Sequence, residues 1–185
     1  VTNYSRRHLD EFLELKKKIK SNSLGNLSLI NITFNRGLIN NGCHYFDFLC
    51  WIFNKNIKIE SLKLKKSRFL RNDFYGIIHL KIGLTKVIII ILDQNNISYE
   101  NIQIFGTKGK IQITDDENIH YYNLKKNLSN NFSKFNLKFS RKINYNKALK
   151  NFYYNYKKDI NLDKFEFFND SLFIKILKKI GKNEI

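Results

Sequence analysis

Apolar and polar positions follow two different periods along the chain, and each change of period marks a predicted element. Apolar residues spaced three or four apart predict helices at about residues 7–22, 39–53, 145–158 and 166–181. Alternation with a period of two predicts strands at about residues 27–34, 57–65, 74–82, 85–93, 98–105, 110–114 and 119–124. Residues 125–141 are polar and irregular, and we predict a long loop there.

The order of these elements indicates the fold class. Consecutive strands joined by short turns are typical of antiparallel pairing, because parallel neighbours need long crossovers. A regular alternation of strands and helices is absent from the pattern. We therefore predict an α+β fold: an open, mainly antiparallel sheet with helices packed on one face. The 185 residues are enough for one domain with its own core, so residues 1–185 are predicted to be a single domain.

Composition excludes two broad classes. Hydrophobic residues make up 43% of the chain, too many for a disordered protein. The longest apolar run, residues 87–92, is far shorter than the roughly 18 residues that a membrane span requires. No signal-peptide pattern follows Val1. Because the chain starts at Val1 and contains no Met, we expect a fragment or a processed product.

The net charge of +17 leaves a nucleic-acid partner as one alternative. The lysines, however, are spread over every segment. An abundance of Lys, Asn, Ile, Phe and Tyr with no Pro is typical of an AT-rich genome. We therefore expect no specific nucleic-acid partner and no membrane partner. A positive surface still favours the approach of an anionic substrate.

Two cysteines, Cys43 and Cys50, lie seven residues apart in one predicted helix. The helical rise separates them by about 10 Å, too far for a disulfide. We expect free thiols, a reducing compartment and hence a cytoplasmic protein. A metal site needs further soft ligands nearby, so none is predicted.

The helix predicted at 39–53 carries the candidate chemistry. Asn40, His44 and Asp47 are spaced at i, i+4 and i+7, which predicts one shared face on an otherwise apolar helix. Buried polar groups need partners or a cavity. A histidine suits proton transfer because its ordinary pKa lies near neutral pH. Two alternatives stay open: His44 as a satisfied core residue, and Asp47 as the partner of an arginine.

The surroundings of this helix add a family resemblance. Gly37-Leu-Ile-Asn40-Asn-Gly-Cys-His44, followed by Asp47, resembles a glycine-rich turn and a helix bearing Asp-x-x-x-His with a further Asp. Similar family-like segments lie at residues 3–7, 24–27, 106–111 and 170–177. In this order they resemble the C-terminal domain of the Gfo/Idh/MocA family of NAD(P)-dependent oxidoreductases. The block from Gly37 to Asp47 is the specific part of the resemblance.

The resemblance implies a fold and an activity. The fold would be the glyceraldehyde-3-phosphate-dehydrogenase-like C-terminal domain, with residues 1–6 ending the crossover from a dinucleotide-binding domain. Hydride would pass between NAD or NADP and a hydroxyl-bearing or carbonyl carbon of a sugar, nucleotide-sugar or cyclitol, in carbohydrate or surface-glycan metabolism. His44 would act in catalysis beside a lysine of the other domain, and a homodimer or homotetramer would form through the sheet face. The candidate substrate-binding residues are Asn40, Asn41, Asp47, Arg6, Arg7, Arg36 and Tyr45.

Two departures from the family pattern limit the prediction. Asn40 replaces the usual carboxylate, and an amide cannot take a proton. The chain also lacks a Gly-x-Gly-x-x-Gly turn, so nothing in it is predicted to hold a pyrophosphate. We expect the 185-residue chain alone to bind NAD(P) weakly and to be inactive. The alternatives are a non-catalytic dimerisation or ligand-sensing relic of the family and, third, a basic nucleic-acid-binding module.

Overall fold

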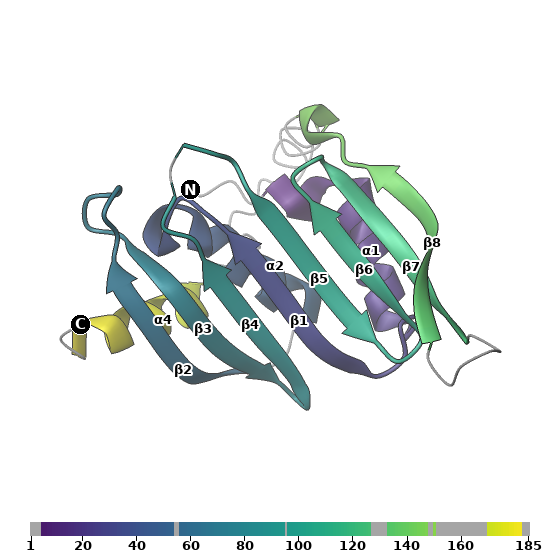
Figure 1. Cartoon of the computed structure of the whole chain (residues 1–185), viewed down its shortest axis with the longest axis horizontal. Coiled ribbons are helices and arrows are strands. Elements are labelled where there is room, and N and C mark those ends of the chain that lie inside the picture. Colours follow the sequence, from purple (N-terminus) through teal and green to yellow (C-terminus); the bar gives the residue numbers. More distant parts are fainter. Residues whose placement is uncertain are drawn as a thin grey trace, which may run out of the picture.

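The computed structural model describes residues 5–53, 56–94, 96–126, 133–147, 150 and 170–182. These residues form one open sheet of eight strands in the order β2-β3-β4-β1-β5-β6-β7-β8 (Figure 1). Neighbouring strands are antiparallel except for β1 and β4, which run parallel. The strands are β1 (Leu27–Phe34), β2 (Ile57–Lys66), β3 (Phe74–Ile82), β4 (Thr85–Ile91), β5 (Glu100–Gly106), β6 (Gly109–Thr114), β7 (Asn118–Lys126) and β8 (Ser133–Lys142).

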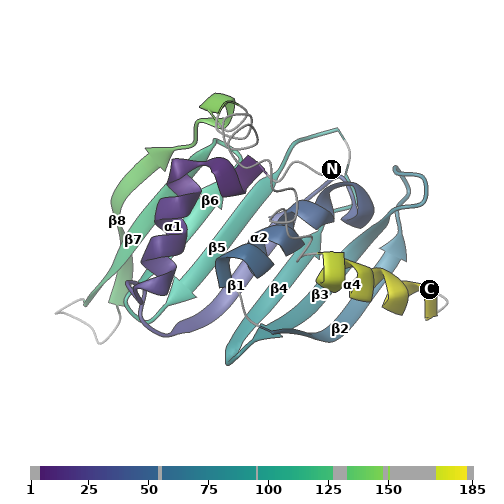
Figure 2. The same ribbon diagram turned by 180° about the vertical axis from the view of Figure 1, so that it is seen from behind.

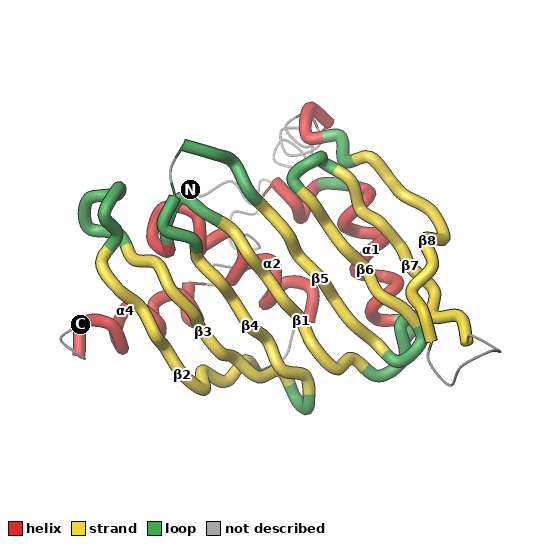
Figure 3. The backbone as a smooth tube through the Cα atoms, viewed as in Figure 1, coloured by secondary structure: helices red, strands yellow, loops and turns green. Residues whose placement is uncertain are grey.

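The helices cover one face of this sheet, as Figure 2 shows from the helical side and Figure 3 shows by secondary structure. They are α1 (Asp10–Lys20), α2 (Cys43–Phe53) and α4 (Asp170–Lys182), with a 3-10 turn η1 (Ser5–His8) and a π turn η2 (Leu38–Gly42). The predicted α+β class, with a mainly antiparallel sheet and helices on one face, is confirmed.

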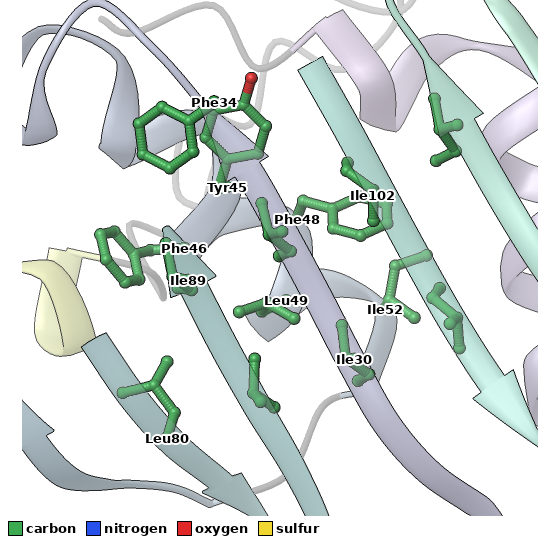
Figure 4. Packing of buried hydrophobic residues seen from close by; sticks show 14 of the residues in the cluster. Ile30, Phe34, Tyr45, Phe46, Phe48, Leu49, Ile52, Leu80, Ile89 and Ile102 are labelled. Carbon is green, nitrogen blue, oxygen red and sulfur yellow. The ribbon is translucent and has the colours of Figure 1, made fainter. Parts of the chain in front are cut away.

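The core lies between α2 and the centre of the sheet (Figure 4). Alternate residues of β1 point toward the helices, so Ile30, Ile32 and Phe34 are fully buried. Phe46 and Leu49 of α2 are also fully buried against these strands. The ring of Phe34 stacks on that of Tyr45, with 4.1 Å between their centroids. This packing fixes the start of α2 against the end of β1.

Strand β8 corrects one prediction, because its residues were expected to belong to a loop. It pairs antiparallel with β7 along its whole length and forms one edge of the sheet. Phe135, Leu137 and Phe139 alternate with polar residues, which is the period of a strand. That signal was missed because the strand is mostly exposed and rich in polar and basic residues, as edge strands often are.

The start of α2 corrects a second expectation. A π turn takes one more residue per hydrogen-bonded turn than an α-helix, so it rotates the residues before it. Residues 39–42, predicted as the start of a helix at 39–53, belong to this π turn, and Ile39 there is 42% exposed. Of the helices predicted at 145–158 and 166–181, residues 145–147 and 150 are helical and α4 begins at Asp170. Residues 151–169 lie outside the described part of the chain.

Both cysteines are free thiols on α2. Burial, together with the nearby Asp47 carboxylate, raises the pKa of Cys50 to about 11, so this thiol stays protonated at neutral pH. Within the described residues, no helix is long and apolar enough to cross a membrane. The same residues contain no cluster of three His, Cys, Asp or Glu side chains that could bind a metal ion.

Candidate active site

The segment between β1 and α2 has an unusual backbone. Arg36 and Gly37 both have positive φ, +67° and +79°, which turns the chain sharply at the end of β1. A Cβ atom on Gly37 would lie 2.2 Å from Oδ2 of Asp73, so this position requires glycine. The buried Asp73 carboxylate accepts the backbone N–H groups of Ile39 at 2.8 Å and Asn40 at 3.0 Å. An acidic side chain of the β2–β3 loop therefore caps the start of the helix.

A polar pocket of about 260 Å³ opens beside this turn, where β1 ends and β5 begins. Its walls come from η1, the β1–α2 segment, the first turn of α2, the residues around the start of β5, and Tyr145. The lining residues are Ser5, Arg6, Asn35, Arg36, Asn41, His44, Tyr45, Ser98, Tyr99, Glu100 and Tyr145.

His44 is the group in this pocket best suited to move a proton. Its side chain is half-buried near the first turn of α2. Burial lowers the pKa of His44, the charge of Arg6 lowers it further, and Glu100 acts in the opposite direction. With its pKa below the ordinary value of 6.5, the imidazole is neutral at neutral pH. A neutral imidazole can accept a proton from a hydroxyl group.

Glu100, the first residue of β5, connects several pocket residues. Its carboxylate forms an ion pair with Arg6 and accepts the hydroxyl of Tyr45 at 2.7 Å. Burial is the largest single influence and lowers the pKa of Arg6, but Glu100, Tyr45 and Tyr145 together outweigh it and raise this pKa. Burial and Glu100 together raise the pKa of Tyr45, which keeps the phenol protonated as a donor. Sequence reasoning missed Glu100, because 94 residues separate it from Arg6 and no local pattern marks it.

Asn35 builds the rim of the pocket. Its amide nitrogen donates to the carbonyl of Ile97, and its amide oxygen accepts the N–H of Tyr99 at 3.1 Å. Asn41 donates in turn to the carbonyl of Asn35 at 3.1 Å. These bonds attach the segment leading into β5 to the end of β1, so Tyr99 is held in the lining of the pocket that also contains His44.

The structure separates the predicted site residues into two groups. Those brought together in the pocket lining are Arg6, Arg36, Asn41, His44 and Tyr45. Three others lie outside the lining: Asn40, Arg7 and Asp47. Of the three residues predicted to share one face, Asn40, His44 and Asp47, only His44 lines the pocket.

Asp47 lies beneath the helix surface, with its side chain only 2% exposed. Arg7 binds it with two groups: Nε donates to Oδ2 at 3.0 Å, and Nη2 pairs with Oδ1. Of the alternatives considered for Asp47, pairing with an arginine is the one observed. Asn40 is exposed, and its backbone N–H is bound by Asp73.

A second hollow, of about 460 Å³, lies in the β2–β3 loop at residues 66–74. Its lining contains no histidine, and Arg68 there pairs with Asp93 at 2.8 Å. Asp73 at its end already binds the turn before α2. Although it is larger, this hollow offers no evident group for proton transfer, so the pocket around His44 is the stronger candidate.

Comparison with known proteins identifies the fold. No family model and no curated protein sequence matches the chain. Among solved structures, a dehydrogenase (MviM) from Clostridium difficile is 15% identical with a TM-score of 0.63, and the match covers 95% of this chain and 60% of that one. KijD10, a 3-ketoreductase from Actinomadura kijaniata in complex with NADP, is 9% identical with a TM-score of 0.62, covering 88% and 54%. Another structure of KijD10 is a complex with TDP-benzene and NADP.

A regulatory protein has the same fold. The super-repressor mutant of Gal80p from Saccharomyces cerevisiae is 15% identical with a TM-score of 0.60, over 89% of this chain and 53% of that one. The chain thus spans between half and two thirds of the length of these neighbours. It has the fold of the C-terminal domain of Gfo/Idh/MocA-type oxidoreductases.

Proposed function

We propose that this chain is the substrate-binding domain of an NAD(P)-dependent oxidoreductase that acts on a hydroxyl or carbonyl group of a sugar, nucleotide-sugar or cyclitol. The observation that carries the proposal is a half-buried His44, with a lowered pKa, in a polar pocket of this fold. Amide, hydroxyl and phenol groups line the pocket, and these suit a ligand that presents several hydroxyl groups. Carbohydrate or surface-glycan metabolism is the setting we propose.

In this mechanism His44 accepts the proton of the reacting hydroxyl during oxidation and returns it during reduction. We expect Asn41 and Tyr99, which also line the pocket, to orient neighbouring hydroxyl groups. The hydroxyl of Tyr45 already donates to Glu100, so we assign Tyr45 to the wall of the pocket and not to substrate binding. A nicotinamide cofactor would supply the hydride chemistry.

The turn before α2 does not fit the cofactor's pyrophosphate. A helix N-terminus that binds phosphate presents unpaired N–H groups. At the turn before α2, the Asp73 carboxylate already accepts two of these groups and would repel a phosphate. We therefore propose that a separate dinucleotide-binding domain holds NAD or NADP, and that residues 1–185 form one substrate-side domain.

Arg36 is the pocket arginine that we propose to bind an anionic group of the substrate. Within the described part of the chain, Arg6 pairs with Glu100 and Arg7 with Asp47, whereas exposed Arg36 forms no ion pair. A nucleotide-sugar would offer a phosphate to this guanidinium. The guanidinium of Arg36 therefore favours an anionic substrate over a neutral cyclitol.

The matching prediction concerns binding. Arg36→Met should weaken nucleotide-sugar binding about 10-fold, because it removes one charge-assisted contact. It should leave the affinity for the corresponding neutral sugar unchanged. Isothermal titration calorimetry measures both, with Arg71→Met of the larger hollow as the matched control. A greater loss in Arg71→Met than in Arg36→Met would contradict the assignment.

A second candidate function is a non-catalytic, ligand-sensing or dimerisation role. Asn40 in place of a carboxylate favours it, as does the shared fold with Gal80p. The intact His44 pocket favours the enzyme. For the nucleic-acid-binding alternative, no feature of the described residues adds support beyond the overall positive charge.

We further propose a homodimer or homotetramer that forms through the sheet face opposite the helices. Leu29, Ile88 and Ile90 are only partly buried on that face. Oδ1 of Asn31, at its centre, is buried without a hydrogen-bond partner among the described residues. Sedimentation equilibrium should give a multiple of the chain mass, and Ile88→Lys, but not the control Leu84→Lys, should lower it. A wild-type monomer at micromolar concentration would contradict this assembly.

A further inference from the structure

Three segments that are distant in sequence meet at Glu100. Arg6 comes from η1, Tyr45 from α2, and Glu100 from the first position of β5. The Arg6 and Glu100 side chains are only 14% and 17% exposed. The guanidinium carbon of Arg6 also lies 5.0 Å from the ring centroid of Tyr45 and 5.8 Å from that of Phe12. Arg6 is therefore held on two sides by rings and at its end by a carboxylate.

This cluster shares the pocket lining with His44. The charged and titratable groups that line the pocket around the imidazole are Arg6, Arg36, Tyr45, Tyr99, Glu100 and Tyr145. Arg6 and Glu100 act on His44 with opposite signs. The phenols of Tyr45 and Tyr145 have raised pKa values, mainly because of burial, and remain neutral. The local balance of charge thus depends mainly on the Arg6–Glu100 pair.

We propose that Glu100 is a positioning residue of this pocket: its carboxylate holds Arg6 and Tyr45 in place and offsets the positive charge that Arg6 imposes on His44. Its catalytic consequence rests on the proposed function. Asn40, four residues before His44, stands where the family pattern has a carboxylate. Glu100 of β5 supplies a carboxylate to the pocket instead. Glu100 acts through its neighbours, whereas His44 transfers the proton.

The test compares histidine titrations by NMR in the 185-residue chain. The chain has four histidines, and a His44→Gln variant assigns the signal of His44. Glu100→Gln keeps the shape and the acceptor oxygen but removes the charge. The midpoint of His44 should then fall by roughly half a pH unit or more, because Arg6 is no longer offset. Arg6→Met should move the midpoint upward.

The two directions separate this role from a merely structural one. A pocket that simply loosened would expose His44 and raise its midpoint in both variants, since burial is what lowers it most. An unchanged or higher midpoint in folded Glu100→Gln would overturn the proposal. The midpoints of His8, His79 and His120 are the internal controls.

A double variant keeps the test decisive if Glu100→Gln alone does not fold. Arg6→Met/Glu100→Gln removes both charges together, and its His44 midpoint should lie below that of Arg6→Met. Equal midpoints would overturn the proposal. Because the titration requires no turnover, a failure of the proposed enzymatic function would leave this result intact, and the reverse also holds.

Discussion

Replacing His44 by alanine is expected to lower kcat by about 10²–10⁴-fold, the usual contribution of a positioned acid–base group. The assay uses the chain joined to its proposed dinucleotide-binding domain. KM should change little, because the loss falls on the proton-transfer step. His8→Gln is the matched control, since His8 lies outside the pocket lining. An undiminished kcat in His44→Ala would remove His44 from the mechanism.

The pH dependence follows from the same residue. Oxidation requires neutral His44, and burial together with Arg6 lowers its pKa below 6.5. Activity should therefore be retained as the pH falls to 6.5 and be lost only at lower pH, as the imidazole becomes protonated. A plot of kcat/KM against pH reports this midpoint for the free enzyme. In His44→Ala the acidic decline should disappear.

The second large effect concerns stability. Arg7→Met should lower the free energy of unfolding by about 3 kcal/mol, because it leaves the charge of Asp47 buried without its guanidinium partner. Asp47 is 2% exposed and Arg7 is 25% exposed. Urea denaturation of the 185-residue chain measures the change. The double variant Arg7→Met/Asp47→Leu should recover much of the loss, since an apolar pair of similar size needs no counter-charge.

A surface pair provides the control for this prediction. Arg141 bonds to Glu14 at 2.5 Å, but these side chains are 49% and 30% exposed. Solvent screens such pairs, so Arg141→Met should cost less than about 1 kcal/mol. An equal cost in Arg7→Met and Arg141→Met would contradict a structural role for the Arg7–Asp47 pair. If Arg7→Met lost substrate affinity but not stability, Arg7 would be assigned to substrate binding, as the sequence predicted.

Local periodicity was sufficient for most of the fold. The strands from β1 to β7 and helix α2 were predicted from apolar spacing, because their buried faces impose a regular pattern. Strand β8 was missed because it is an edge strand whose apolar residues, Phe135 and Leu137, are 40% and 56% exposed. The parallel pairing of β1 with β4 could not be predicted either, because no local pattern shows which distant strand pairs with β1.

Site residues could be predicted from the sequence only where they lie close together in one segment. His44 and Gly37 stand in a compact motif, so sequence spacing found them. Glu100 and Asp73 come from distant strands and loops, and nothing near them marks a role. A π turn precedes Cys43, so regular helical spacing alone did not fix where Asn40 lies relative to His44 and Asp47. Arg6 and Arg7 are adjacent, yet one lines the pocket and the other pairs beneath the helix.

Hydride transfer by the chain joined to its dinucleotide-binding domain is the most direct test of the proposed function. The protein is mixed with NAD or NADP and a panel of nucleotide-sugars, sugars and cyclitols, and the absorbance of the reduced nicotinamide is followed. We expect reduction of the nicotinamide with at least one nucleotide-sugar, dependent on His44 and weakened at low substrate concentration by Arg36→Met. A protein that binds both cofactor and sugar but reduces no nicotinamide across the panel would contradict it, and would favour the non-catalytic role.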